Sequence, residues 1–204
     1  MEIAIDFISV YNESKRKQTA LESEAAWKWL SIKTRKGCYI MAEQGRYPVR
    51  NAKLEDMGLL AEIMVRSFRS AFASFMSKET LDACTEERNC RAMLECVYRE
   101  GKMHFLIAGS SGMLVWQDAE EDTAEIVAVH SLPESWGTGC GEVMLREALA
   151  QMRAAGKRSV FLWAFQENQR ARRFYEKYGL RWDGSVRNSE FDGAAEVRYE
   201  MEGL

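Results

Sequence analysis

Three glycines at alternate positions, Gly137, Gly139 and Gly141, stand directly before a segment that has the features of a helix. This segment, "EVMLREALAQMRAAG", carries apolar residues at helical spacing and ends at Gly156. The strand-like run "AEIVAVHSL" precedes the glycines, so the chain turns here from a strand into a helix. Amides at a helix N-terminus lack intrahelical partners and carry partial positive charge. The loop is therefore a predicted phosphate-binding site.

Two familiar phosphate-binding loops do not fit this spacing. A Walker A loop has Lys and then Ser or Thr after its last glycine, whereas Glu142 and Val143 follow Gly141. A dinucleotide loop of the form G-x-G-x-x-G needs its third glycine where Glu142 or Met144 stands. The glycines therefore belong to a third kind of loop.

The composition limits the class of protein. The chain has 204 residues, of which 47% are hydrophobic, and this is enough for the core of one ordinary domain. Its net charge of -3 and the absence of an isolated Lys/Arg cluster argue against a nucleic-acid partner. No stretch approaches the ~20 apolar residues of a membrane span. The five cysteines show no zinc-binding spacing, and an odd number fits a reducing compartment. We expect a cytoplasmic protein without a metal, a membrane or a nucleic-acid partner.

The order of the remaining segments predicts the fold. Residues 47–202 read as a mostly antiparallel set of strands with helices between the later ones, which indicates an α/β (α+β) fold with a mixed sheet flanked by helices. Residues 1–46 differ in character and form a predicted extension of unknown role, followed by one domain at residues 47–204. The predicted strands are 47–53, 102–109, 112–117, 124–132 and 159–165, with two more within 180–201. We expect the strand 159–165 to be buried on both faces. One predicted helix begins near Glu55, and three others cover 77–99, 142–156 and 168–179.

Two motifs resemble those of the GNAT superfamily of N-acetyltransferases. The run from Trp136 to Gly141, "WGTGCG", resembles the acyl-CoA loop Q/R-x-x-G-x-G/A, with Trp136 at the Gln/Arg position. About thirty residues later, "NQRARRFYEKYGL" resembles the signature N-x-x-A-x-x-x-Y-x-x-x-G-F, with Leu180 in place of Phe. The resemblance covers about residues 47–202 and implies the GNAT fold. The positions that match the second signature are Asn168, Ala171, Tyr175 and Gly179.

The resemblance implies that acetyl-CoA is the cosubstrate. A backbone N–H near Ser131 is then expected to bond the thioester carbonyl. Asn168 is expected to contact the pantetheine arm, and its side chain is also suited to cap the helix that follows. The residues expected to bind the cosubstrate are Ser131, Trp136, Gly137, Thr138, Gly139, Cys140, Gly141 and Asn168.

Catalysis of acetyl transfer needs an acid for the leaving thiolate and a base for the amine. Tyr175 matches the family's general acid, although an aromatic core residue in a helix would give the same spacing. For the base we expect Glu125, which lies eight residues before Pro133, where GNAT sequences often carry Glu. His130 on the same strand and water are the alternatives.

We therefore expect an acetyl-CoA-dependent N-acetyltransferase that acts on a primary amine of a small molecule or a protein or peptide, by direct attack in a ternary complex. The alternative is a CoA-binding regulatory module without turnover. Residues 66–80 and the last hairpin are expected to form the acceptor side, but they do not identify the amine. The sequence allows a homodimer.

Overall fold

The computed structural model describes residues 46–204, so the predicted extension lies outside the described residues except for Arg46. Within the described part, seven strands form one sheet in the order β1-β2-β3-β4-β5-β7-β6. The neighbours β4 and β5 run parallel, and every other pair is antiparallel. This confirms the predicted mixed, mostly antiparallel sheet. The strands are β1 (Val49–Asn51), β2 (Met103–Ala108), β3 (Gly112–Glu120), β4 (Thr123–Ser131), β5 (Ser159–Phe165), β6 (Arg181–Asn188) and β7 (Ala195–Glu202).

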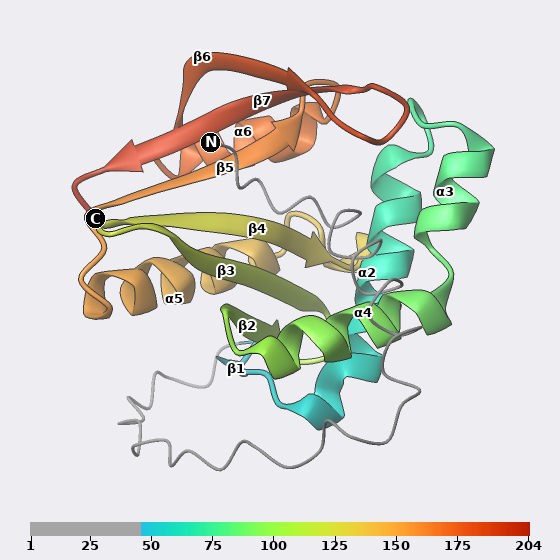
Figure 1. The fold of residues 1–204 in the computed structure, drawn as a ribbon, viewed down its shortest axis with the longest axis horizontal. Coiled ribbons are helices and arrows are strands. Elements are labelled where there is room, and N and C mark those ends of the chain that lie inside the picture. The colour runs from blue at the N-terminus through green and yellow to red at the C-terminus, as the bar shows by residue number, and fades with distance from the viewer. Residues whose placement is uncertain (1–45) are drawn as a thin grey trace, which may run out of the picture.

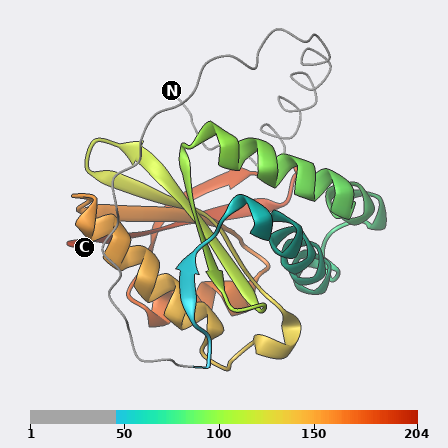
Figure 2. The ribbon, with the colours of Figure 1, turned by 90° about the horizontal axis from the view of Figure 1, so that it is seen from below.

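Helices cover both faces of the sheet, as Figures 1 and 2 show. On one face α2 (Met57–Phe72) and α4 (Glu87–Glu100) pack against β2, β3 and β4. On the other face α5 (Cys140–Ala154) and α6 (Gln169–Lys177) bury a second apolar cluster against the central strands. The remaining helical elements are α3 (Lys78–Cys84) and the 3-10 turns η1 (Leu54–Asp56) and η2 (Pro133–Ser135).

The amphipathic pattern of α5 explains its position. Met144, Leu145, Ala148, Leu149 and Met152 recur at helical spacing and are all buried in the same apolar cluster. Their burial fixes the helix against the sheet, and so fixes the glycine loop at its N-terminus. None of the helices in residues 46–204 is both long and apolar enough to cross a lipid bilayer.

The predicted helix over residues 77–99 is wrong at one point, because the chain breaks it into α3 and α4. Thr85 ends α3 with its hydroxyl bonded to the carbonyl of Leu81, and Glu86 has an extended backbone before α4 begins. A side chain that bonds back to the preceding turn competes with continuation of the helix. The break lets α3 run in a different direction from α4.

The prediction that β5 is buried on both faces is also corrected. Val160, Leu162 and Ala164 are buried in the core, whereas Phe161 and Trp163 on the opposite face remain partly exposed. Arginine side chains cover that face, with Arg198 over Phe161 and Arg187 over Trp163. An apolar run alone does not distinguish cover by a helix from cover by guanidinium groups.

The sheet splits between its two parallel strands. β4 and β5 are paired only from Thr123 to Ile126 on β4, and beyond that point they diverge (Figure 1). In the same region the register between β3 and β4 shifts, so that Val127 is an extra residue between the partners of Val115 and Trp116. A bulge of this kind bends the strand and increases its twist. The result is a wedge-shaped opening in the middle of the sheet, which we call the splay.

Candidate active site

The glycine loop connects β4 to α5. Gly137 and Gly139 have φ angles of 73° and 97°, a left-handed conformation that favours glycine. The first bond of the helix runs from the Val143 amide to the Gly139 carbonyl at 3.1 Å. The amides of residues 140–142 therefore have no place in the helical ladder, and they carry the positive end of the helix dipole. The geometry fits the predicted anion site.

Side chains below the loop hold it in this shape. Thr138 Oγ1 donates to the Ser135 carbonyl at 2.8 Å, so Tyr47 donates its phenolic hydrogen to Thr138 Oγ1 at 2.6 Å. Trp136 Nε1 donates to the Ser131 carbonyl at 2.9 Å, which joins the loop to the end of β4. These three bonds tie the loop to Tyr47 and to the end of β4.

Gly141 allows α5 and α6 to pack closely, and its backbone angle is not one that requires glycine. A Cβ atom at this position would lie 3.2 Å from the ring of Phe174 on α6. The side chain of Cys140 is fully buried, and burial raises the pKa of its thiol to about 11. Cys140 and Gly141 can therefore contribute only backbone amides to a ligand.

A cavity of about 440 Å³ opens above this loop, and we call it the loop cavity. Arg170, Arg173 and Lys177 from α6 line it opposite Glu142, which leaves an excess of positive charge. The guanidinium of Arg170 stacks on the ring of Trp136 and so carries a positive charge to the position where the motif has Gln or Arg. Among the residues expected to bind the cosubstrate, Ser131, Trp136, Gly137, Gly139, Gly141 and Asn168 line this cavity, whereas Thr138 and Cys140 do not.

Two amides of β4 face the splay. The Leu132 amide donates to the Ser111 carbonyl at 2.9 Å, on the β3 side. Because successive residues of a strand direct their amides to opposite sides, those of Ser131 and Val129 point away from β3. β5 does not pair with β4 there, so no strand of the described residues takes up these two donors.

Helix α6 holds Tyr175 in the site. Asn168 Oδ1 accepts from the Ala171 amide at 3.2 Å, which confirms its predicted role as the N-cap of this helix. Tyr199 accepts from Arg172 Nε and donates to Glu176, so β7 holds the helix on both sides of Tyr175. Burial raises the pKa of Tyr175 well above its usual range, and the phenol therefore keeps its proton at neutral pH.

Glu125 lies on β4 at the inner end of the splay. Its side chain is buried, and Gln117 Nε2 donates to its Oε2 at 2.8 Å. Burial raises the pKa of this carboxyl, and the bond from Gln117 offsets only part of that effect. A carboxylate with a raised pKa is a better proton acceptor than an exposed one.

His130 is half-buried near the outer end of β4, where a helix fixes its ring. Ser67 Oγ donates to the Met64 carbonyl at 3.0 Å and lies 2.8 Å from His130 Nδ1. Since the serine proton is already used, Nδ1 is the donor and Nε2 keeps its lone pair. Burial lowers the pKa of His130 to about 4, so the imidazole is neutral and a weak base.

A second cavity of about 410 Å³ fills the splay, and we call it the splay cavity. Glu125 and His130 line it together with side chains from α2, α4 and the loop between β6 and β7. The splay cavity and the loop cavity meet, because six residues line both of them. These are Phe72, Val129, His130, Asn168, Ala171 and Tyr175.

A sheet that splits between two parallel strands, with a glycine loop and a helix after one of them, defines the GNAT class of acyltransferase folds. A family model described as the acetyltransferase (GNAT) family matches residues 58–180, and the chain belongs to this family. It is 25% identical over 136 residues to uncharacterized N-acetyltransferases of Mycobacterium bovis and Mycobacterium tuberculosis, which covers 65% of this chain and 87% of each relative. The protein is an N-acetyltransferase.

Solved structures share the fold. One is the PaiA N-acetyltransferase of Thermoplasma acidophilum in complex with coenzyme A, with a TM-score of 0.67, 22% identity, and coverage of 78% of this chain and 99% of that one. Another is YncA of Salmonella typhimurium, described as a putative acetyltransferase with its cofactor acetyl-CoA, with a TM-score of 0.59, 15% identity, and coverage of 78% and 94%.

Several functional contacts were not predicted from the sequence. Tyr47 under the loop, Ser67 behind His130 and Gln117 beside Glu125 each bond a residue at least eight positions away. The register of β3 on β4 places Gln117 opposite Glu125, and correct pairing of these strands would have found that contact. Arg170 had no sequence signal beyond its charge, and only its stacking on Trp136 distinguishes it from other helix arginines.

Proposed function

We propose that the protein transfers the acetyl group of acetyl-CoA directly to a primary amine while both substrates are bound. The observation that supports this proposal most strongly is the meeting of the loop cavity and the splay cavity at His130 and Tyr175. Two substrates that occupy the two cavities would touch at this point. A direct transfer needs no covalent intermediate on the enzyme.

The loop cavity suits coenzyme A. The amides of residues 140–142 would bond the pyrophosphate, and Arg170, Arg173 and Lys177 would add positive charge beside it. The amides of Ser131 and Val129 would then bond the pantetheine arm and the thioester oxygen. These donors are fixed by the strand, so they stabilise the developing oxyanion without reorganisation.

The splay cavity would hold the amine. Glu125 would accept the proton of the ammonium group through a water molecule, and His130 Nε2 would orient the amine by accepting a hydrogen bond. Glu125 is the better base of the two, because its pKa is raised whereas that of His130 is lowered to about 4. The neutral nitrogen then attacks the thioester carbon.

Tyr175 would complete the reaction. As the new N–C bond forms and the C–S bond breaks, the nitrogen gives up its second proton to water, the thiolate takes the phenolic proton of Tyr175, and the phenolate recovers a proton from solvent. The phenol is protonated at neutral pH, so it has a proton to give when the thiolate appears. No described residue makes a hydrogen bond with this hydroxyl, so none of residues 46–204 competes for its proton.

Two measurements test the proposal together. Acetyl-CoA should raise the melting temperature of the purified protein, because it binds only the folded state. Release of free coenzyme A thiol should depend on an added primary amine, and mass spectrometry should find the acetyl group on that amine. Stabilisation by acetyl-CoA with no amine-dependent release over a broad panel would contradict the transfer reaction, and acetylation of the protein itself as an obligatory step would contradict direct attack.

A further inference from the structure

Aromatic rings form one part of the wall of the splay cavity. We call Phe68, Phe72, Phe165 and Phe191 the aromatic cluster; they come from α2, β5 and the loop between β6 and β7. Their ring centroids lie 4.4 Å apart for Phe68 and Phe72, and 4.9 Å apart for Phe72 and Phe165. Phe191 closes the group at 5.7 Å from Phe68 and 6.0 Å from Phe165. This part of the cavity fits an apolar body.

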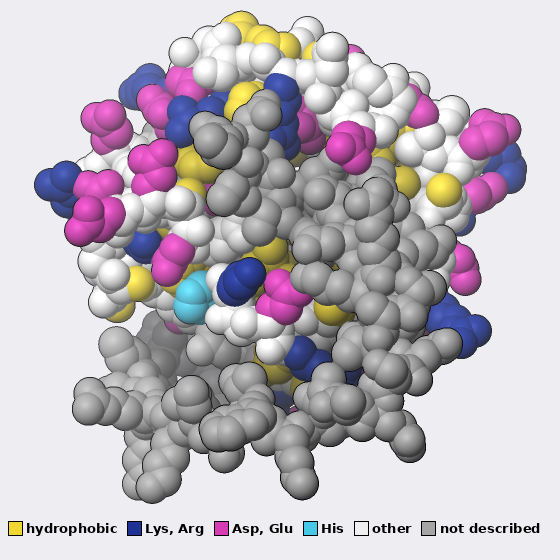
Figure 3. Space-filling model, in the orientation of Figure 1, with side chains coloured by type: hydrophobic (Ala, Val, Ile, Leu, Met, Phe, Trp, Pro, Cys, Tyr) yellow, Lys and Arg dark blue, Asp and Glu magenta, His cyan; other side chains and the backbone are white. Residues whose placement is uncertain are grey.

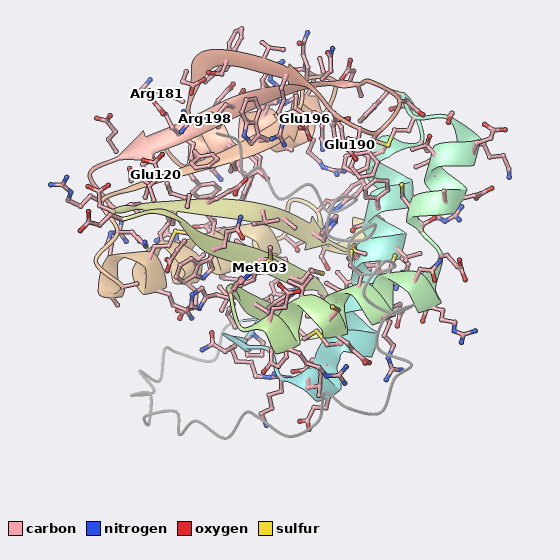
Figure 4. The ribbon with its side chains drawn as sticks, in the orientation of Figure 1. Met103, Glu120, Arg181, Glu190, Glu196 and Arg198 are labelled. Atoms are coloured by element: carbon pink, nitrogen blue, oxygen red, sulfur yellow. The ribbon has the colours of Figure 1, made fainter. Side chains whose placement is uncertain are left out.

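The charged side chains of the same cavity come from β4, β6 and β7. Glu125, Arg187 and Glu196 are the charged side chains among its described lining residues. Arg187 Nε donates to Glu196 Oε2 at 2.6 Å, and its guanidinium carbon lies 4.3 Å from the centroid of the Trp163 ring. Figure 4 shows Glu196 and Arg198 on β7, with Glu196 nearer the end at which β4 and β5 diverge.

This arrangement has a consequence for the charge of the ligand. Arg187 forms an ion pair with Glu196, so the charge of Glu125 gives the cavity an excess of one negative charge. His130 is neutral and adds no positive charge. A ligand carboxylate would therefore meet no unmatched cation among the described lining residues, while it would approach two carboxylates. The excess charge suits one ammonium group and not several.

We infer that the acceptor is a monoamine with a single aromatic ring or a similar apolar body and without a carboxylate, such as an arylalkylamine. This inference rests on the proposed function, because it takes the splay cavity as the acceptor site. The amine lies near His130 and Tyr175, where the two cavities meet, and the apolar body fills the aromatic cluster. A volume of about 410 Å³ accommodates one ring and a short alkyl chain.

The test compares three primary amines of matched design. Phenethylamine carries the expected ring and amine, phenylalanine differs from it by one carboxylate, and putrescine replaces the ring with a second ammonium group. Calorimetric titration into the protein saturated with coenzyme A measures binding, and steady-state acetylation measures turnover. The affinity and kcat/KM for phenethylamine should exceed those for each of the others by about tenfold or more.

A variant examines the aromatic cluster itself. Phe191→Ala should raise the KM for phenethylamine by about tenfold and leave the KM for propylamine within about twofold, since propylamine is too short to fill the cluster. Leu54→Ala changes an exposed side chain on η1 and serves as the control. Stabilisation by acetyl-CoA should be the same in both variants, which shows that the fold and the loop cavity are intact.

The outcomes separate this inference from the proposed function. Preferential binding of phenethylamine without acetylation would sustain the inference and contradict the transfer reaction. Equal or better binding of phenylalanine or putrescine would overturn the inference, and so would the absence of binding by all three amines. Equal losses for phenethylamine and propylamine in Phe191→Ala would also overturn it.

Discussion

Glu125 and His130 point into the same cavity although an odd number of positions separates them on one strand. Side chains of a regular strand alternate between faces, so residues five apart would lie on opposite sides of the sheet. The extra residue Val127 removes this alternation, and Val127 and Ala128 both pack against the α2 and α4 side. The bulge thus places the proposed base and the fixed imidazole on one face.

The first prediction concerns the proposed acid. Tyr175→Phe keeps the buried ring but removes the proton donor, so turnover should fall by about 10²–10⁴-fold if departure of the thiolate limits the rate. Calorimetric binding of acetyl-CoA should change little. Tyr98→Phe is the control, since it removes a phenol of α4 whose only hydrogen bond in the described residues is a 3.4 Å contact to the Ala52 carbonyl. Unchanged turnover in Tyr175→Phe would mean that the proton comes from water.

The second prediction concerns the loop. Gly139→Glu should abolish stabilisation by acetyl-CoA in a thermal shift assay, because it places a negative side chain at the anion site. Gly156→Glu is the matched control at the other end of α5: Gly156 also has a positive φ, 84° against 97°, and open space around its Cβ position. If Gly139→Glu is stabilised as strongly as wild type, the phosphates bind elsewhere.

The third prediction concerns Glu125 and pH. A carboxylate must be ionised to act as a base, so kcat/KM should rise with pH through the raised pKa of Glu125. Glu125→Gln should remove this rise and lower the value of kcat/KM at high pH by about 10²-fold. Glu120→Gln, at an exposed position on β3, should retain the wild-type profile. A wild-type pH profile in Glu125→Gln would assign the proton to another acceptor.

The same substitution has a predicted effect on stability. Because the folded pKa of Glu125 is raised, its contribution to stability is present at low pH and is lost as the pH rises through that pKa. Glu125→Gln should therefore raise the melting temperature at neutral pH by a few degrees, and the difference should shrink below about pH 4. Scanning calorimetry over this range measures both. A lower melting temperature at neutral pH would show that the carboxylate stabilises the fold.

The fourth prediction concerns the serine behind His130. Ser67→Ala removes the acceptor for His130 Nδ1, so the ring loses its fixed orientation and kcat/KM should fall by about tenfold with stabilisation by acetyl-CoA unchanged. Ser70→Ala on the same helix removes an exposed hydroxyl that, within the described residues, bonds only the Arg66 carbonyl, and it should behave as wild type. Equal effects of the two changes would assign Ser67 a role in the helix alone.

The surface that Figure 3 displays carries acidic and basic side chains intermixed over its described part. Charge on this face therefore does not identify a substrate. The information about the acceptor lies inside the splay cavity, where Glu125, Arg187 and Glu196 are the charged groups among the described lining residues.

Local patterns in the sequence were sufficient for the family, the class of fold and the order of most elements. The glycine loop and the N-x-x-A-x-x-x-Y motif act over a few residues, because backbone angles, helix capping and burial of one helix face depend on near neighbours. For the same reason the N-cap role of Asn168 was predictable. The break at Thr85 was missed because its side chain competes with a helix that composition alone favours.

The tertiary structure alone decided how the site is assembled. The bulge at Val127 shifts the strand register by one residue. The ion pair of Arg187 with Glu196 and the stacking of Arg170 on Trp136 join different elements of the fold. Such contacts depend on strand pairing and on packing between helices, which leave no periodic signal in the chain. The sequence by itself determined that this protein has a glycine loop at the start of a helix and a tyrosine in the motif of an acetyltransferase. Only the folded sheet, by splitting between β4 and β5, placed that tyrosine where two cavities meet.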